Sequence, residues 1–227
     1  MLEIQKLSGG YGRTPVLKEL SFELRQGELL GILGHNGAGK TTLMRTIAGF
    51  LPATGGSISL DGRDVTAKAA HERARAGLGY VPQGRRIFPA LSVRENLELA
   101  ANRDGKPVDE VLALFPRIKP LLERRGGQLS GGEQQLLALA RCLCIGPKVV
   151  LLDEPTEGIQ PSIIEELIET LRELNRSIGL TILLVEQNLE CLTALTSRIL
   201  VLSRGSLVRE LTGADAHDED MLAELML

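Results

Sequence analysis

The chain has 227 residues, of which 43% are hydrophobic, and this is enough apolar material for the core of one large domain. Its 26 basic and 29 acidic residues give a net charge of −3, which argues against a nucleic-acid grip spread over the surface. With two tyrosines, four phenylalanines and no tryptophan, the sequence also lacks the rings for a base-stacking platform. We therefore expect no nucleic-acid partner.

Cysteine usage and hydropathy exclude two further classes. Cys142, Cys144 and Cys191 form no C-x-x-C pair and the three histidines are far apart, so neither a disulfide framework nor a structural zinc site is expected. No apolar stretch approaches the roughly 18 residues needed to span a bilayer, and the amino terminus lacks a signal-like run. We expect a cytoplasmic chain that reaches a membrane only through a partner, with the acidic run 215–219 as a solvated end.

In chain order, short apolar segments and turns predict antiparallel strands over 2–7 and 16–24, joined by a glycine-rich turn at 8–12. Later apolar runs predict buried strands over 29–33 and 149–152 and further strands over 57–60, 78–81 and 181–185. Glycine turns at 54–56 and 61–62 bracket the strand 57–60. Helical periodicity predicts helices over 40–50, 135–145 and 162–177. The alternation predicts an α/β fold with a mostly parallel sheet, carrying an N-terminal antiparallel subdomain and, over about 84–145, an inserted helical subdomain. The core would comprise about 1–83 and 146–227, within one domain of residues 1–227.

A glycine-rich loop follows the apolar run 29–33 and precedes the predicted helix from Lys40. It reads Gly34-His35-Asn36-Gly37-Ala38-Gly39-Lys40-Thr41-Thr42 and satisfies G-x-x-x-x-G-K-[ST] in its strand-to-helix context. Glycines let backbone N–H groups converge on phosphate oxygens, Lys40 neutralises phosphate charge, and the Thr41 hydroxyl can face Mg²⁺. The pattern predicts a site for nucleoside triphosphate.

A carboxylate pair stands at the end of another buried strand. Asp153 follows the run 149–152, where it can supply a second hard oxygen ligand to Mg²⁺. Glu154 comes next and can orient or polarise an attacking water. Together with the glycine loop, the pair predicts a nucleoside triphosphatase.

A third motif narrows the class. Leu129 is followed by Ser130-Gly131-Gly132-Glu133-Gln134 and a helical pattern, which is a second potential anion site at a helix start. With this string, the chain resembles the ATP-binding subunits of ABC transporters over essentially its whole length. The resemblance implies a P-loop NTPase (RecA-like) fold, ATP and Mg²⁺ as cofactors, and ATP hydrolysis.

The same resemblance implies roles for further residues and partners. Tyr11, which could otherwise be a packing residue, resembles the ring that stacks on adenine. Gln83 resembles the glutamine that belongs to the magnesium site, with Thr41 and Asp153, and joins it to the helical subdomain. Each ATP would lie between one chain's glycine loop and the residues 130–134 of a second ATP-binding subunit, in a homodimer or a heterodimer. Integral membrane permease subunits, and through them a solute-binding protein, would hold the dimer on the cytoplasmic face of the membrane.

Two positions depart from the family pattern. Gln160 stands where an aspartate is common, and Gln187 stands where a histidine is usual. A glutamine amide can donate a hydrogen bond to the γ-phosphate but cannot accept a proton near neutral pH. This predicts a minor catalytic role for Gln187 and leaves Glu154 as the base.

The tract Val185-Glu186-Gln187-Asn188 resembles the ATPases of branched-chain amino-acid importers and of urea importers. The tract 157–164 and Arg124-Arg125-Gly126-Gly127 resemble the urea branch. Urea, or a short amide, is therefore the expected solute, with branched-chain amino acids as the alternative. A soluble ABC regulator and a small-molecule P-loop kinase are alternatives from other classes.

Overall fold

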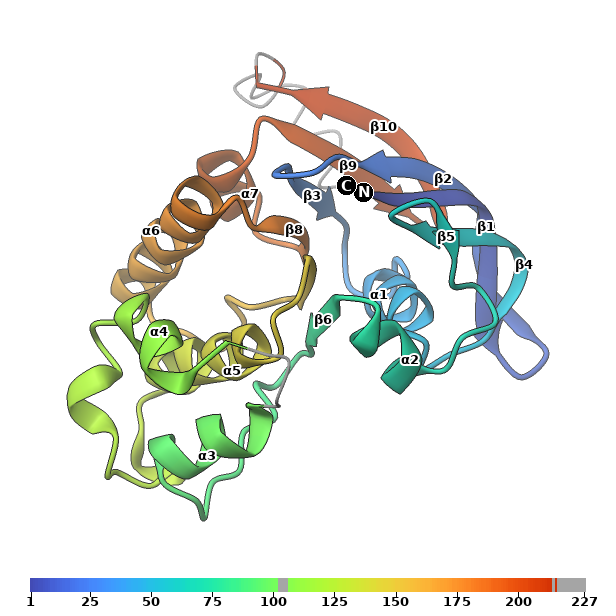
Figure 1. Cartoon of the computed structure of the whole chain (residues 1–227). Coiled ribbons are helices and arrows are strands. Elements are labelled where there is room, and N and C mark those ends of the chain that lie inside the picture. Colours follow the sequence, from blue (N-terminus) through green and yellow to red (C-terminus); the bar gives the residue numbers. More distant parts are fainter. Residues whose placement is uncertain (102–105, 214, 216–227) are drawn as a thin grey trace.

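The computed structural model describes residues 1–101, 106–213 and 215 (Figure 1). Apart from Asp215, the acidic run expected to be a solvated end lies outside these residues. Within the described ranges, no helix is long and apolar enough to cross a membrane.

The N-terminal part forms a four-stranded antiparallel sheet, as predicted. Its strands follow the order β2-β1-β4-β5 and are β1 (Leu2–Tyr11), β2 (Thr14–Leu24), β4 (Ala53–Leu60) and β5 (Arg63–Asp64). Alternate residues of β1 and β2 are buried, so one face of this sheet covers the core.

Two glycine-rich segments expected to be turns are instead parts of strands. Residues 8–11 continue β1, and Gly55 and Gly56 belong to β4. Gly56 has φ +76°, and a Cβ there would lie 2.3 Å from the carbonyl oxygen of Gln5. The register of β1 against β4 shifts between Gln5 and Ser8. The turn prediction was wrong here because these glycines serve a bulge and a close backbone approach.

The second sheet has six strands and is mostly parallel, which confirms the predicted class. In the order β10-β9-β3-β8-β7-β6, only β10 runs antiparallel to its neighbour. The strands are β3 (Leu29–Leu33), β6 (Leu78–Val81), β7 (Val149–Asp153), β8 (Thr181–Glu186), β9 (Arg198–Ser203) and β10 (Ser206–Thr212). The sequence interpretation named no strand after β8.

Helices cover both faces of this sheet (Figure 1). They are α1 (Lys40–Ala48), α2 (Ala70–Arg75), α3 (Val93–Ala100), α4 (Val108–Ala113), α5 (Gly131–Cys144), α6 (Pro161–Ile178) and α7 (Leu189–Leu195). Short 3₁₀ turns occupy Lys119–Leu121 and Gly126–Gln128. Helices α3, α4 and α5 all fall between β6 and β7 in the chain, in the segment for which the insertion was predicted. The exact subdomain boundaries stay a prediction.

The six-stranded sheet divides the interior into two apolar cores. Leu30 and Ile32 of β3 pack with α1 and the antiparallel sheet, whereas Leu29 and Leu33 pack with the helices on the other face. Because both faces are covered, every residue of β3, β7 and β8 is buried. This explains why these strands read as continuous apolar runs.

A buried arginine ties α2 to the end of α1. Arg73 is 2% exposed, and its Nη1 donates to the carbonyls of Thr46 (2.8 Å) and Ile47 (2.6 Å). Its Nη2 and Nε donate to the carbonyls of Thr66 and Lys68. A cation at a helix C-terminus pairs with otherwise unpartnered carbonyls, so Arg73 fixes where α1 ends.

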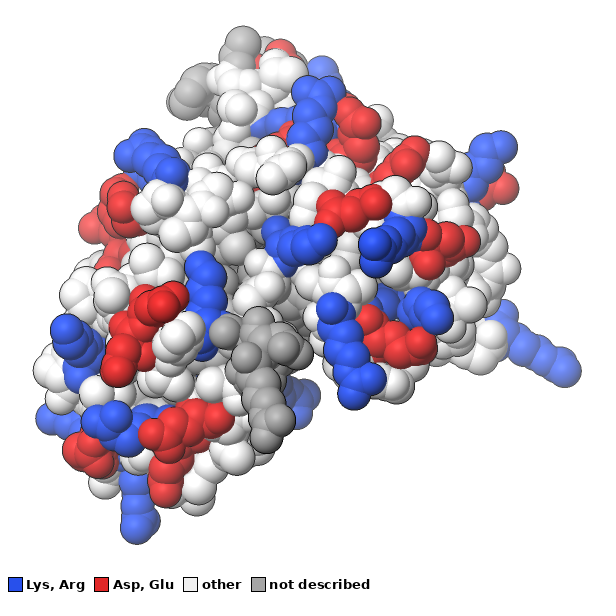
Figure 2. Space-filling view, in the orientation of Figure 1, with Lys and Arg blue, Asp and Glu red and all other residues white. Residues whose placement is uncertain are grey.

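The state of the cysteines and the distribution of surface charge are those expected from the composition. The three cysteines are free and buried, and burial raises the pKa of the Cys142 and Cys191 thiols to about 12, so they behave as small apolar side chains. Figure 2 shows acidic and basic side chains interleaved over the visible face. The absence of a nucleic-acid partner stays a prediction.

Candidate functional site

The predicted glycine loop lies at the carboxyl end of β3, where it turns into α1. Gly37 and Gly39 have φ +82° and +110°, conformations that favour glycine. A Cβ on Gly34 would lie 2.8 Å from the carbonyl oxygen of Leu202. Gly39 also forms the N-cap of α1 without a side-chain cap, so the first turn of the helix opens toward the loop. Backbone N–H groups and a helix start therefore face a common space, as an anion requires.

This space is a cavity of about 260 Å³ beside the glycine loop. It is lined by Val16, His35, Asn36, Gly37, Gly39, Lys40, Thr41, Thr42, Gln83 and Glu154. Most of the residues predicted to bind nucleotide are thus in one place. Tyr11, at the end of β1, is 46% exposed and does not line the cavity; Val16, from the same hairpin, does. Stacking of Tyr11 on adenine stays a prediction.

Lys40 is almost fully buried and lines this cavity. Its ammonium donates to the carbonyls of Gly34 (2.5 Å) and His35 (3.0 Å) and forms an ion pair with Glu154 Oε1 at 2.9 Å. Both side chains of the pair are at most 6% exposed. A buried carboxylate and a buried ammonium stabilise each other only as a pair, so each fixes the position of the other.

Glu154 is held from several directions. Its backbone has φ +47°, a strained conformation for a residue other than glycine, and its N–H donates to the carbonyl of Val185 at 3.0 Å. The Gln83 amide donates to Glu154 Oε2 (3.1 Å) and to Glu157 Oε2 (2.9 Å). The strain and these bonds direct the carboxylate into the cavity.

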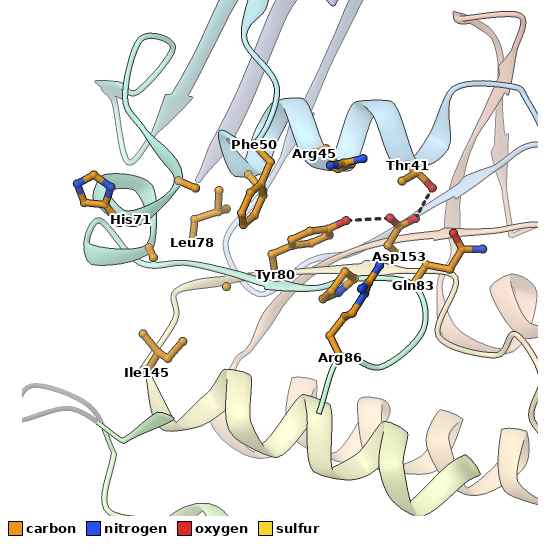
Figure 3. A pocket seen from close by; sticks show the side chains of 15 residues that line it. Thr41, Arg45, Phe50, His71, Leu78, Tyr80, Gln83, Arg86, Ile145 and Asp153 are labelled. Carbon is orange, nitrogen blue, oxygen red and sulfur yellow. Dashed lines mark hydrogen bonds between the residues drawn. The ribbon is translucent and has the colours of Figure 1, made fainter. Parts of the chain in front are cut away.

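Asp153 lies beside Thr41, the other residue that the sequence predicted to face Mg²⁺. The Thr41 hydroxyl donates to Asp153 Oδ1 at 3.2 Å, and the Tyr80 hydroxyl donates to Oδ2 at 2.9 Å (Figure 3). Burial raises the pKa of Asp153 to about 6, although both hydroxyls act to lower it. Burial and the nearby Asp153 carboxylate likewise raise the pKa of the Tyr80 hydroxyl, which stays a donor at neutral pH.

The donor set suits a hard cation. One carboxylate and one hydroxyl, next to space for phosphates, are what Mg²⁺ uses when the nucleotide and water supply its remaining ligands. Within the described part of the chain, no group of three or more His, Cys, Asp or Glu could hold a metal ion. The Thr41 hydroxyl and the Asp153 carboxylate, beside this cavity, thus fit Mg²⁺ bound together with a phosphorylated ligand.

The raised pKa of Asp153 predicts a specific dependence of stability on pH. Because its folded pKa (about 6) exceeds its ordinary value of 3.8, its contribution to stability is complete below about pH 4 and is lost as the pH rises through 6. In metal-free, nucleotide-free protein, the free energy of unfolding of the wild type relative to Asp153→Asn should fall by about 2 kcal/mol from pH 4 to pH 7. Urea unfolding of both proteins across this range measures it, and a constant difference would contradict the assigned pKa.

Glu186, which the sequence interpretation did not single out, organises the loop after β8. Its Oε1 accepts bonds from the Thr156 N–H (2.9 Å) and hydroxyl (2.7 Å), and its Oε2 accepts from the Gln187 N–H (3.1 Å). Burial raises the pKa of this carboxyl, and it is 1% exposed. Gln187 itself is exposed at the same edge of the sheet. Glu186 is a carboxylate at the end of a buried strand, as Asp153 is, and this pattern could have identified it from the sequence.

The second predicted anion site is built separately. Ser130 is the N-cap of α5: its Oγ accepts from the Glu133 N–H (3.3 Å), while Glu133 Oε2 accepts from the Ser130 N–H (2.8 Å). A Cβ on Gly132 would lie 1.8 Å from Ile163 Cγ2, so only glycine fits there. The helix also begins four residues before the predicted 135, because this capping box supplies its start.

Residues 130–134 and the glycine loop have different neighbours. Glu133 pairs with Arg117 at 3.8 Å, and the Gln134 amide donates to the carbonyls of Gly126 and Leu129. These partners lie outside the cavity that contains Lys40 and Glu154. Gln160, the other departure from the family pattern, is an exposed N-cap of α6 without a side-chain cap bond.

A glycine loop between a buried parallel strand and a helix, with a buried lysine and a carboxylate from a neighbouring strand, defines a P-loop nucleotide-binding protein. The ABC transporter family model matches residues 17–157, more than half of the chain. The chain belongs to the ABC transporter family, as one of its ATP-hydrolysing subunits.

Curated relatives cover nearly the whole chain. The high-affinity branched-chain amino acid transport ATP-binding protein BraG of Pseudomonas aeruginosa is 42% identical over 94% of both chains. A probable branched-chain amino acid transport ATP-binding protein, LivF of Archaeoglobus fulgidus, is 35% identical over 84% of this chain and 83% of its own. The lipopolysaccharide export system ATP-binding protein LptB of Escherichia coli K12 is 32% identical over 100% and 96%.

Solved structures share the fold. The dimeric ATP-binding cassette MJ0796, bound to ADP and phosphate in a post-hydrolysis state, superposes with a TM-score of 0.82. It is 25% identical and covers 94% of this chain and 99% of its own.

Proposed function

We propose that this chain is the ATP-hydrolysing subunit of an importer for branched-chain amino acids. The observation that carries the chemistry is the convergence of Lys40, Thr41, Asp153 and Glu154 on one cavity beside a glycine loop. The observation that favours the solute is the 42% identity to BraG over 94% of both chains.

In the proposed mechanism, the loop N–H groups and the start of α1 bind the phosphates, and Lys40 exchanges part of its contact with Glu154 for phosphate oxygens. Thr41 and Asp153 would hold Mg²⁺, which supplies charge neutralisation at the transferring phosphoryl group when bound. Glu154 orients the attacking water and accepts its proton, and Gln83 keeps the glutamate in place. Gln187, lacking a titrating group, contributes a hydrogen bond at most.

The proposed working unit is a dimer. The start of α5 offers the Ser130 hydroxyl and helix N–H groups to a phosphate, yet its side-chain partners lie away from the glycine loop of the same chain. A second subunit, identical or related, would bring its own residues 130–134 onto this chain's ATP. ATP would then close the dimer and hydrolysis would reopen it.

The proposed permease contact is a second cavity, of about 840 Å³, between α1, α2 and β6. Its walls include exposed Phe50 with Ala74, Leu78 and Ile145, and it shares Thr41 and Gln83 with the nucleotide cavity. A segment of an integral membrane permease seated here would hold the chain on the cytoplasmic face of the membrane, with a solute-binding protein acting through the permease.

The evidence for the solute comes from the similarity to relatives and not from the residues of the nucleotide site. BraG and LivF favour the branched-chain alternative over the urea expected from the tract 157–164. That tract lies on the loop before α6 and on the start of α6, outside the nucleotide cavity, so it supports urea through resemblance alone. Urea stays a second candidate because of this tract.

The decisive experiment is solute uptake in cells that lack this chain, with labelled leucine and labelled urea at limiting concentrations. We expect leucine uptake to be lost, urea uptake to be unchanged, and leucine uptake to return with the wild-type chain but not with Lys40→Ala. Loss of urea uptake alone would show that urea, and not a branched-chain amino acid, is the solute, and would leave the proposed ATPase mechanism unchanged. No change in the uptake of either solute would favour a soluble ABC regulator, or the ATP-binding subunit of an export system, as LptB is.

A further inference from the structure

Tyr80 lines the larger cavity, next to the nucleotide cavity with which it shares Thr41 and Gln83, and the proposed function gives Tyr80 no role. It is the third residue of β6, which pairs with β7 so that Tyr80 is opposite Leu151. Residues two apart in a strand face the same side, so Asp153 projects toward the same face as Leu151. The Tyr80 side chain is therefore aligned with Asp153 by the register of the sheet.

The Tyr80 hydroxyl completes the hydrogen bonding of the Asp153 carboxylate. It donates to Oδ2 at 2.9 Å while Thr41 donates to Oδ1 at 3.2 Å, so each carboxylate oxygen has its own donor. Figure 3 shows the three side chains in a row, with Asp153 in the middle. Two donors at opposite oxygens fix the rotation of the carboxylate, which a single donor leaves free.

The ring of Tyr80 forms part of the wall of the larger cavity. It packs against Phe50, with ring centroids 5.8 Å apart and planes tilted by 46°. Phe50 is 58% exposed and follows α1, whose first turn carries Thr41. Phe50, Tyr80, Asp153 and Thr41 thus form a continuous path from the outer cavity to the pair of oxygens proposed to hold Mg²⁺ (Figure 3).

We propose that Tyr80 is a positioning residue whose hydroxyl fixes the Asp153 carboxylate for Mg²⁺ binding. This inference rests on the proposed function, because it needs Thr41 and Asp153 to be the magnesium ligands. Groups that orient a metal-binding side chain typically account for about 10- to 100-fold in metal affinity. Asp153 also has the like charge of Glu154 beside it, which makes a donor at Oδ2 more important for holding its charged form in place.

Tyr80→Phe tests the proposal, because it keeps the ring packed on Phe50 and removes only the hydroxyl. We expect it to raise the Mg²⁺ concentration needed for half-maximal binding of a fluorescent ATP analogue by about 10-fold or more. Mn²⁺ affinity, measured by electron paramagnetic resonance with a non-hydrolysable ATP analogue, should fall by the same factor. Binding of the nucleotide in EDTA should be unchanged. Neither readout depends on turnover.

Phe50→Leu is the matched control, since it removes the ring contact and leaves the hydroxyl on Asp153. Its Mg²⁺ midpoint should equal that of the wild type. Equal midpoints for Tyr80→Phe and the wild type would overturn the role of Tyr80, as would weaker nucleotide binding by Tyr80→Phe in EDTA, which indicates general damage to the site. If wild-type nucleotide binding itself ignores Mg²⁺, the proposed magnesium site fails instead, and the two failures are thereby distinguished.

Discussion

Replacing Glu154 with glutamine is expected to slow ATP hydrolysis by about 10²- to 10⁴-fold while ATP still binds. The amide has the shape of the carboxylate but cannot accept a proton from water. Because the Lys40 ammonium pairs with Glu154 at 2.9 Å, loss of the carboxylate charge also leaves Lys40 freer to bind phosphate. With hydrolysis blocked, the ATP-bound dimer should accumulate.

Phosphate release and gel filtration with Mg²⁺ and ATP measure these two effects. Glu157→Gln is the matched control, because Glu157 also accepts a bond from Gln83, at 2.9 Å, but is exposed. It should hydrolyse ATP at close to the wild-type rate. Ordinary turnover by Glu154→Gln would remove Glu154 as the base. An absent dimer would instead favour a P-loop kinase, which has no reason to enclose its nucleotide between two copies.

Lys40→Ala is expected to weaken ATP binding by about 100-fold or more. Lys40 is 4% exposed, and its ammonium is already positioned by the carbonyls of Gly34 and His35, so it needs little reordering to bind phosphate. Equilibrium binding of a fluorescent ATP analogue measures the loss. An unchanged affinity would contradict the assignment of residues 34–42 as the phosphate site.

The same substitution leaves Glu154 buried without its cation, and breaking a buried ion pair in this way costs about 3–5 kcal/mol of stability. A double variant, Lys40→Ala with Glu154→Gln, separates the two consequences. It should recover most of the lost free energy of unfolding, measured in urea, and none of the ATP affinity. If the double variant is no more stable than Lys40→Ala, the ion pair is not the source of the instability.

Local chemistry made much of the fold predictable. The runs 29–33 and 78–81 are strands with the predicted bounds. Strands that are buried on both faces are continuous runs of apolar residues, which can be recognised in the sequence. The glycine turns at 8–12 and 54–56 were mispredicted because the same residue serves turns and bulges. Which one it serves depends on a partner strand, such as the carbonyl of Gln5 opposite Gly56, that local sequence does not contain.

Sequence by itself determined the class of protein and the chemistry of its site, since a glycine loop, a strand-ending carboxylate pair and the string Ser130 to Gln134 each carry their function in a few adjacent residues. Only the tertiary structure decided which side chains meet. Thr41 and Asp153 are 112 residues apart and touch because the strand order β3-β8-β7-β6 differs from the chain order. Tyr80 and Glu186 entered the site for the same reason: a tyrosine or glutamate in an apolar strand acquires a role only from what the neighbouring strand places beside it.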